Sequence, residues 1–200
     1  MMAFARRWLV ALAVVSVCAG CAIPLQVHEG ETTVAGAMVV TADKGWNHLA
    51  VVDRPWTTWT HDGSVIDELR FWAGMPHGLA IAPTENAEQR PLNFRRTMQP
   101  HELVALFASL QARDGSAVTL EKMEPAQFVG VPGVRFRFSV LRSADDTRLS
   151  EVGWAAVRGE QLYAMTFVAP RLDFFARHEA QVERIARSAR AKKLGAAGAD

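Results

Sequence analysis

Residues 134–140, with the sequence VRFRFSV, alternate strictly between apolar and polar side chains. Successive side chains of a β-strand point to opposite faces, so this alternation predicts a strand with one face on a hydrophobic core and one face in water. The core face would carry the apolar set: Val134, Phe136, Phe138 and Val140. The chain must therefore build a sheet that is covered on at least one side.

Two further strand-like segments follow closely, at residues 149–157 (LSEVGWAAV) and 161–170 (QLYAMTFVAP), with Gly159 in the connection. The second segment is apolar on both faces, which predicts a central strand that is covered on both sides. Connections this short favour antiparallel pairing, because parallel strands need a long crossover.

Helices are predicted on either side of these strands in the sequence. Residues 100–111 begin with Pro100 and repeat apolar side chains at helical spacing: Leu103, Leu106, Phe107 and Leu110. Residues 171–190 carry a second apolar stripe: Phe175, Val182, Ile185 and Ala189. Both stripes would pack on the sheet.

A hairpin is predicted from residues 56–61 and 65–72, because Asp62 and Gly63 form a dipeptide typical of tight turns. The segment 75–91 contains three prolines and no regular period, so we expect a loop there. The fold class is therefore α+β, an antiparallel β-sheet packed with helices. We expect a single globular α+β domain over residues 32–190.

The N-terminus has the pattern of a secretory signal. Arg6 and Arg7 precede an apolar run over residues 8–15, which is too short to span a bilayer as a helix. We therefore expect a signal peptide over residues 1–20, a tether over 21–31 and a flexible tail over 191–200.

Cys18 and Cys21 are the only cysteines, and their spacing also occurs in redox and zinc sites. The small residues Ala19 and Gly20 before Cys21 resemble the lipobox of bacterial lipoproteins, in which the cysteine is lipidated and becomes the first residue. Cleavage there would remove Cys18, so no disulfide could form. The resemblance implies a membrane anchor on Cys21, and Ala22 after it implies the periplasmic face of the outer membrane. Plain secretion to the periplasm is the alternative.

Charge excludes one class of partner. The full chain has a formal net charge of +1. Arg6 and Arg7 contribute two positive charges and no acidic residue precedes Cys21, so removal of residues 1–20 would leave a net charge of −1. We therefore expect no nucleic-acid partner. The sequence contains no cofactor motif, and we expect no cofactor and no metal site.

The order of elements carries a second resemblance. A tryptophan-rich hairpin, a proline-headed helix, the segments QFVGVPGVRFRF and GEQLYAMTFVAP, and a final helix ending IARSAR are together similar to the PsbP/Mog1-like lipoproteins of Gram-negative envelopes. The resemblance implies an α/β/α sandwich and a binding or assembly role rather than catalysis. It transfers no functional residue to this chain.

The candidate enzyme motifs lack the arrangement that catalysis requires. His61, Asp62 and Ser64 lie in one tight turn, where the base cannot stand between nucleophile and acid as a catalytic triad requires. His178 and Glu179 lack a second histidine four positions on, which indicates a pair on a helix surface. We expect no enzyme activity.

One group of aromatic and ionisable residues lies on the predicted hairpin and its exit, and it forms the candidate binding surface: Trp56, Trp59, Trp72, Asp67, Arg70 and His77. Trp56 and Trp59 are an odd number of residues apart, so a regular strand would place them on opposite faces. The sequence thus predicts a non-catalytic envelope lipoprotein that binds an envelope protein or supports assembly. The alternative is a periplasmic small-ligand binder or enzyme that uses a cleft at this hairpin.

Overall fold

The computed structural model describes residues 25–51, 53–84 and 88–192. Its centre is a sheet of eight strands, and each neighbouring pair is antiparallel. In spatial order the strands are β1 (Leu25–Gln26), β4 (Asn47–Leu49), β5 (Thr57–Thr60), β6 (Glu68–Met75), β10 (Gln161–Pro170), β9 (Arg148–Arg158), β8 (Val131–Leu141) and β7 (Ala117–Phe128).

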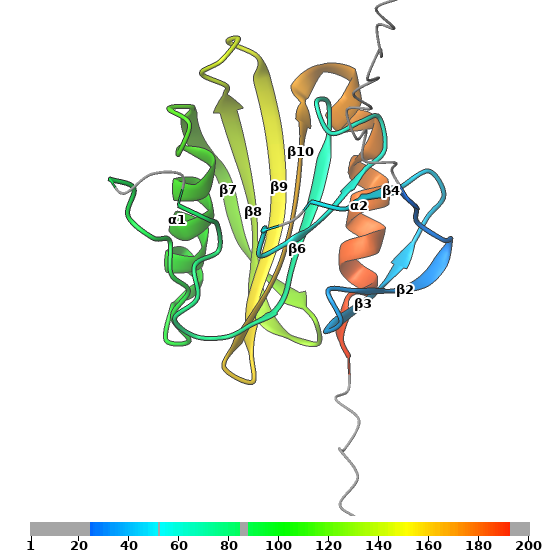
Figure 1. Ribbon diagram of the computed structural model, residues 1–200, viewed down its shortest axis with the longest axis vertical. Coiled ribbons are helices and arrows are strands. Elements are labelled where there is room, and N and C mark those ends of the chain that lie inside the picture. The colour runs from blue at the N-terminus through cyan, green and yellow to red at the C-terminus, as the bar shows by residue number, and fades with distance from the viewer. Residues whose placement is uncertain (1–24, 52, 85–87, 193–200) are drawn as a thin grey trace, which may run out of the picture.

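Helices cover both faces of this sheet (Figure 1). Helix α1 (Pro100–Gln111) packs on one face. Helix α2 (Ala176–Ser188), preceded by the short η1 turn (Arg171–Phe175), packs on the other. A second sheet lies beside α2, with the order β11 (Arg190–Ala191), β3 (Met38–Ala42) and β2 (Gly30–Val34). The predicted α+β class with an antiparallel sheet between helices is confirmed.

Strand β8 has the predicted alternation. Phe136 and Phe138 are fully buried in the core beneath α1. The opposite face is not open to water as predicted, because Arg135 and Arg137 lie under α2. Arg135 donates from Nε to Glu183 Oε1 at 3.0 Å, and Arg137 pairs with Glu179. Ion pairs therefore hold α2 over a strand face that its sequence marks as polar.

The central strand and the two helices also match the prediction. Strand β10 lies between β6 and β9, with Ala164 in the core on the α1 side and Phe167 in the core on the α2 side. Helix α1 is capped by Glu102, whose Oε2 accepts a hydrogen bond from the backbone N–H of Gln99 at 2.8 Å. The predicted stripe of α2 is buried against the sheet.

The predicted domain boundaries were wrong at both ends. The proposed tether over residues 21–31 already contains β1 and the start of β2, and Val27 is buried and bonded to the Trp46 carbonyl at 2.9 Å. These few residues have no hydrophobic period of their own, and their partners β4 and β3 supply the pairing. At the other end Ala191, assigned to the tail, lies in β11 and pairs with Met38 of β3.

The predicted signal peptide, Cys18, Cys21 and most of the tail lie outside the described residues. Neither α1 nor α2, the α-helices of the described ranges, has the length and apolar character needed to cross a bilayer.

Candidate functional site

The predicted hairpin is present as β5 and β6, with Thr57 opposite Phe71 and Trp59 opposite Leu69. Its connection is longer than predicted, because residues 61–67 form a loop instead of a two-residue turn at Asp62 and Gly63. Asp67, predicted on the binding surface, organises this loop. Its carboxylate accepts hydrogen bonds from the Thr60 hydroxyl at 2.8 Å and from the backbone N–H groups of His61 and Asp62 at 2.9 and 2.8 Å. Asp67 is buried, and its role here is structural.

The hairpin tryptophans separate onto two faces, as the spacing predicted. Trp59 is buried on the α2 side, where its ring meets Phe71 at 4.7 Å. Trp56 and Trp72 lie on the α1 side with their rings 5.5 Å apart. Trp72 is fully buried and donates from Nε1 to the Ile81 carbonyl at 2.9 Å. Only Trp56, which is half-buried, is placed to meet a ligand.

His77 does not join the other predicted residues. It is exposed at the exit of β6, and its Nδ1 accepts a hydrogen bond from the backbone N–H of Arg96 at 3.3 Å. The six predicted residues therefore do not form one surface. The structure keeps Trp56 and Arg70 together and assigns Trp59, Trp72 and Asp67 to the interior.

A pocket forms where Trp56 and Arg70 face the C-terminal end of α1. We call it the arginine–tryptophan pocket; its volume is about 170 Å³, and it is lined by Arg54, Trp56, Arg70, Ala82, Pro83, Leu110, Gln111, Arg113 and Asp114. The guanidinium carbons of Arg54 and Arg70 lie 5.2 and 5.4 Å from the Trp56 ring centroid, within range of a cation–π contact. Arg113 donates to the carbonyls of Pro83 and Arg90 at 2.5 and 3.0 Å, which ties the 75–91 loop to the end of α1.

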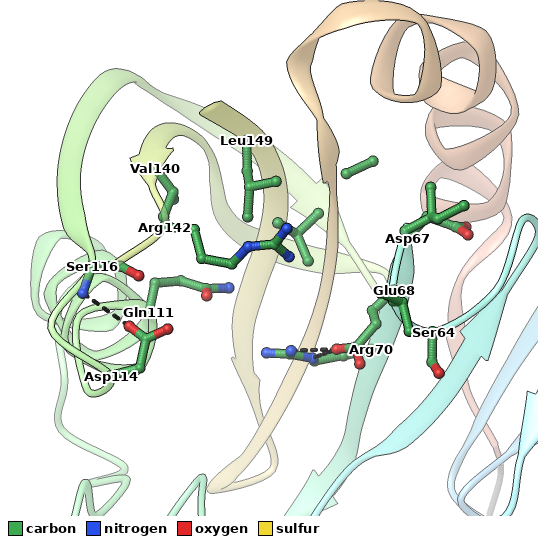
Figure 2. A pocket seen from close by; sticks show the side chains of 14 residues that line it. Ser64, Asp67, Glu68, Arg70, Gln111, Asp114, Ser116, Val140, Arg142 and Leu149 are labelled. Carbon is green, nitrogen blue, oxygen red and sulfur yellow. Dashed lines mark hydrogen bonds and ion pairs between the residues drawn. The ribbon is translucent and has the colours of Figure 1, made fainter. Parts of the chain in front are cut away.

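A second hollow, the polar cavity, shares Arg70, Gln111 and Asp114 with this pocket and has a volume of about 160 Å³. Figure 2 shows the Arg142 and Gln111 side chains extending toward the strand that carries Arg70. Its arginines already have partners. Arg70 Nε donates to Glu68 Oε2 at 2.6 Å, and Arg142 holds Asp145 at 2.7 and 2.8 Å. The positive charges of Arg70 and Arg142 in the polar cavity are therefore largely neutralised by Glu68 and Asp145.

The arginine–tryptophan pocket keeps more positive charge. Among the described residues, no carboxylate lies within ion-pair distance of Arg54 or Arg113, whose contacts are with a ring and with carbonyls. Asp114, the acid in the lining, accepts the backbone N–H of Ser116 at 2.9 Å. The pocket therefore suits an anionic group with a flat or apolar part that can lie on Trp56.

The buried carboxyl group of Glu151 lies on the same side of the large sheet, between the sheet and α1. Glu151 lies on β9 opposite Phe138 and Val168, and so on the face that α1 covers. It is fully buried, and neither of its carboxyl oxygens has a hydrogen-bond partner among the described residues. Burial raises the pKa of Glu151 to about 7, against the opposing effects of the Arg70 charge and of the Gln111 and Thr166 side chains. Glu151 therefore holds its proton to a higher pH than an exposed glutamate does.

Trp56 and Arg70 were predicted from the sequence as binding residues, whereas Arg54, Arg113 and Glu151 were not. Arg113 follows a helix and Arg54 precedes a strand, and nothing in their spacing predicts that they line the same pocket. Glu151 carried a detectable signal, since an acid stands in a strand of otherwise apolar and small residues.

No protein-family model matches the chain, and no curated protein matches it in sequence. Among solved structures it is similar to the cyanobacterial PsbP of Synechocystis sp. PCC 6803, with a TM-score of 0.57 and 10% identity over 89% of this chain and 99% of that chain. It is also similar to the Ran-binding protein Mog1p of Saccharomyces cerevisiae, with a TM-score of 0.50 and 8% identity over 81% of this chain and 94% of that chain.

A protein of Bacteroides thetaiotaomicron is similar as well, with a TM-score of 0.51 and 8% identity over 84% of this chain and half of that longer chain. Likeness at such low identity concerns the fold alone. The chain has the PsbP/Mog1-like fold, as the sequence resemblance implied.

Proposed function

We propose that the chain is a non-catalytic lipoprotein of the cell envelope that binds an envelope protein through the arginine–tryptophan pocket. Acyl chains on Cys21 would anchor it to the periplasmic face of the outer membrane. The signal pattern ending in Cys21 supports the anchor, and the pocket beside α1 supports the binding role.

The observation that carries the binding role is the size of this pocket. At about 170 Å³ it is smaller than the roughly 300–1,000 Å³ of typical small-molecule sites. It has room for one side chain or one chain terminus of a larger partner. Tryptophan and arginine are also the residue types that most often dominate the energetics of protein interfaces. At this pocket the small volume therefore favours a side chain of a protein partner over a free metabolite.

The positive charge of the arginine–tryptophan pocket indicates which group of a partner would bind there. Arg54, Arg70 and Arg113 line the pocket together with one acid, Asp114. Glu68 pairs with Arg70, so positive charge remains in excess. A carboxylate of the partner, from Asp, Glu or a C-terminus, would find guanidinium donors in a fork that fits its two oxygens. Hydrophobic atoms next to that carboxylate would cover Trp56.

Photo-crosslinking in intact cells tests this proposal. A photoreactive amino acid replaces Ala112, which is exposed beside the pocket without lining it. The control replaces Gln127, which is exposed near the far end of β7, roughly 30 Å along the strand from Ala117. We expect a discrete protein adduct from position 112 and none from position 127. Absence of an adduct from position 112, with a small molecule co-purifying instead, would contradict the proposal.

A second candidate function rests on Glu151. A carboxyl group with a pKa of about 7 is the kind of group that enzymes use for proton transfer. The alternative is therefore a periplasmic small-ligand binder or enzyme that uses a cleft at the Trp56–Trp72 hairpin. Glu151 lines neither the arginine–tryptophan pocket nor the polar cavity, but the Gln111 side chain, which lines both, acts on its pKa. A small molecule recovered with the purified chain, and lost in Gln111→Ala, would favour this alternative.

The anchor makes a separate prediction. Cys21→Ser removes the thiol that would carry the acyl chain, so the variant should incorporate no labelled palmitate and should accumulate as uncleaved precursor. Cys18→Ser is the matched control and should be processed normally, because Cys18 would be discarded with the signal peptide. Normal acylation of Cys21→Ser would refute the lipoprotein assignment.

A further inference from the structure

The loop after β5 meets helix α2 at a cluster of two histidines and an aspartate. His178 Nε2 lies 2.6 Å from Asp62 Oδ2, although the two residues are 116 positions apart. The sequence pattern placed His178 on the helix surface, and this was wrong: its side chain is only 4% exposed. His178 shares the α2 stripe of Val182 and Ile185, four and seven residues on, which faces the sheet.

His61 completes the cluster from the other side of Asp62. Its Nδ1 lies 3.6 Å from Asp62 Oδ1, and its ring centroid is 4.2 Å from that of His178. Its Nε2 faces the backbone of Gly45, where an added Cβ would stand only 2.3 Å away. Nδ1 is buried and has no hydrogen-bond partner within the part of the chain that the structure describes. The free nitrogen of His61 thus points toward the aspartate.

We propose that His61, Asp62 and His178 form a binding site for a divalent transition metal, best matched by Zn²⁺. The three ligand atoms lie within 4.8 Å of one another, so a small movement brings each to the roughly 2.0–2.2 Å that zinc requires. Two imidazole nitrogens and one carboxylate, with a fourth position open, are a ligand set found in catalytic zinc sites. The His61 and Asp62 side chains are 30% and 23% exposed, although His61 Nδ1 itself is buried, so the site lies close to the surface.

The surroundings hold the ligands in place. Asp67 accepts the backbone N–H groups of both His61 and Asp62, which fixes the loop. Trp46 packs edge-on against His61 with the ring centroids 5.7 Å apart. Arg177 opposes a cation, since its Nη1 lies 3.7 Å from Asp62 Oδ2, but its side chain is more than half exposed and can turn away. A bound metal would therefore fasten the loop to α2.

This site is independent of the arginine–tryptophan pocket, so the two proposals can fail separately. The test uses the full chain, purified in detergent without a histidine tag and stripped with EDTA, and titrated with ZnCl₂ by calorimetry. We expect one Zn²⁺ per chain. Asp62→Asn keeps an oxygen that can accept from His178 but removes the charge, and it should weaken zinc binding at least about tenfold, as should His178→Gln. His101 is an exposed histidine of α1, and His101→Ala should leave the zinc affinity unchanged.

A spectroscopic measurement on the unmodified chain removes any dependence on the folding of the variants. Co²⁺ added to the stripped chain should give the intense visible bands of a four-coordinate site, and equimolar Zn²⁺ should abolish them. Absence of these bands, absence of stoichiometric zinc binding, or equal zinc affinity in Asp62→Asn and the unmodified chain would each overturn the proposal.

Discussion

Phe136→Ala is expected to lower the free energy of unfolding by about 3–5 kcal/mol. Phe136 is fully buried between the sheet and α1, where its ring stacks on Phe107 at 5.6 Å and meets Phe138 at 5.0 Å. The ring also lies across Gly153, where a Cβ would stand 2.3 Å from it. Truncation would leave a cavity that the two rigid strands cannot close, so the cost should approach the upper part of this range. Urea unfolding followed by tryptophan fluorescence measures it.

Leu172→Ala is the control for this measurement. Leu172 is 81% exposed, so its truncation should change stability by less than about 0.5 kcal/mol. A loss below about 1 kcal/mol for Phe136→Ala would mean that β8 turns its other face to the α1 layer.

Glu151→Gln is expected to stabilise the protein at pH 8 by up to about 3 kcal/mol. The pKa of Glu151 is about 7 in the folded chain and near its usual 4.5 in the unfolded chain. Between these values the folded chain holds a proton that the unfolded chain has lost, so stability falls as the pH rises. Below pH 4.5 both states are protonated, and above pH 7 the folded state bears the full cost of a buried charge. Glutamine cannot ionise and removes this loss.

The comparison is made by urea unfolding of both proteins at pH 4 and pH 8. At pH 4 the two should be nearly equal, because Glu151 is then neutral in both states. Glu160→Gln, in which the side chain is 69% exposed, controls for the loss of a charge and should shift stability by less than about 1 kcal/mol. A Glu151→Gln variant that is less stable at pH 8 would show that the ionised carboxylate is stabilised by Arg70.

The fold was predictable wherever a single segment carried its own period. The alternation in β8, the doubly apolar β10 and the stripes of both helices each specified an element and its buried face. Strands β1, β4, β7 and β11 were not predicted. β1, β4 and β11 have only two or three residues, and the edge strand β7 is mostly exposed without a regular alternation, so pairing with their partners defines these strands. The β5–β6 loop was misjudged because Asp62 and Gly63 suggest a tight turn, whereas Asp67 holds a longer one.

The site was much less predictable than the fold. The hairpin spacing correctly separated Trp56 from Trp59, but which of them lies under the small sheet is decided by β2 and β3. Arg113 and Trp56 line one pocket only because α1 ends beside the hairpin, and His178 reaches Asp62 only through the register of α2 on the sheet. The proximity of such residues depends on packing between segments distant in the sequence, which local periodicity does not encode.

The central claim is that a partner protein binds at the arginine–tryptophan pocket. The most direct measurement is the yield of the in-cell adduct from the photoreactive residue at position 112, compared between the otherwise unmodified chain and Trp56→Ala at equal protein level. Removing an aromatic anchor of an interface typically weakens binding by at least about tenfold, so the adduct should largely disappear in Trp56→Ala and persist in Gln127→Ala. An adduct of undiminished yield in Trp56→Ala would contradict the claim.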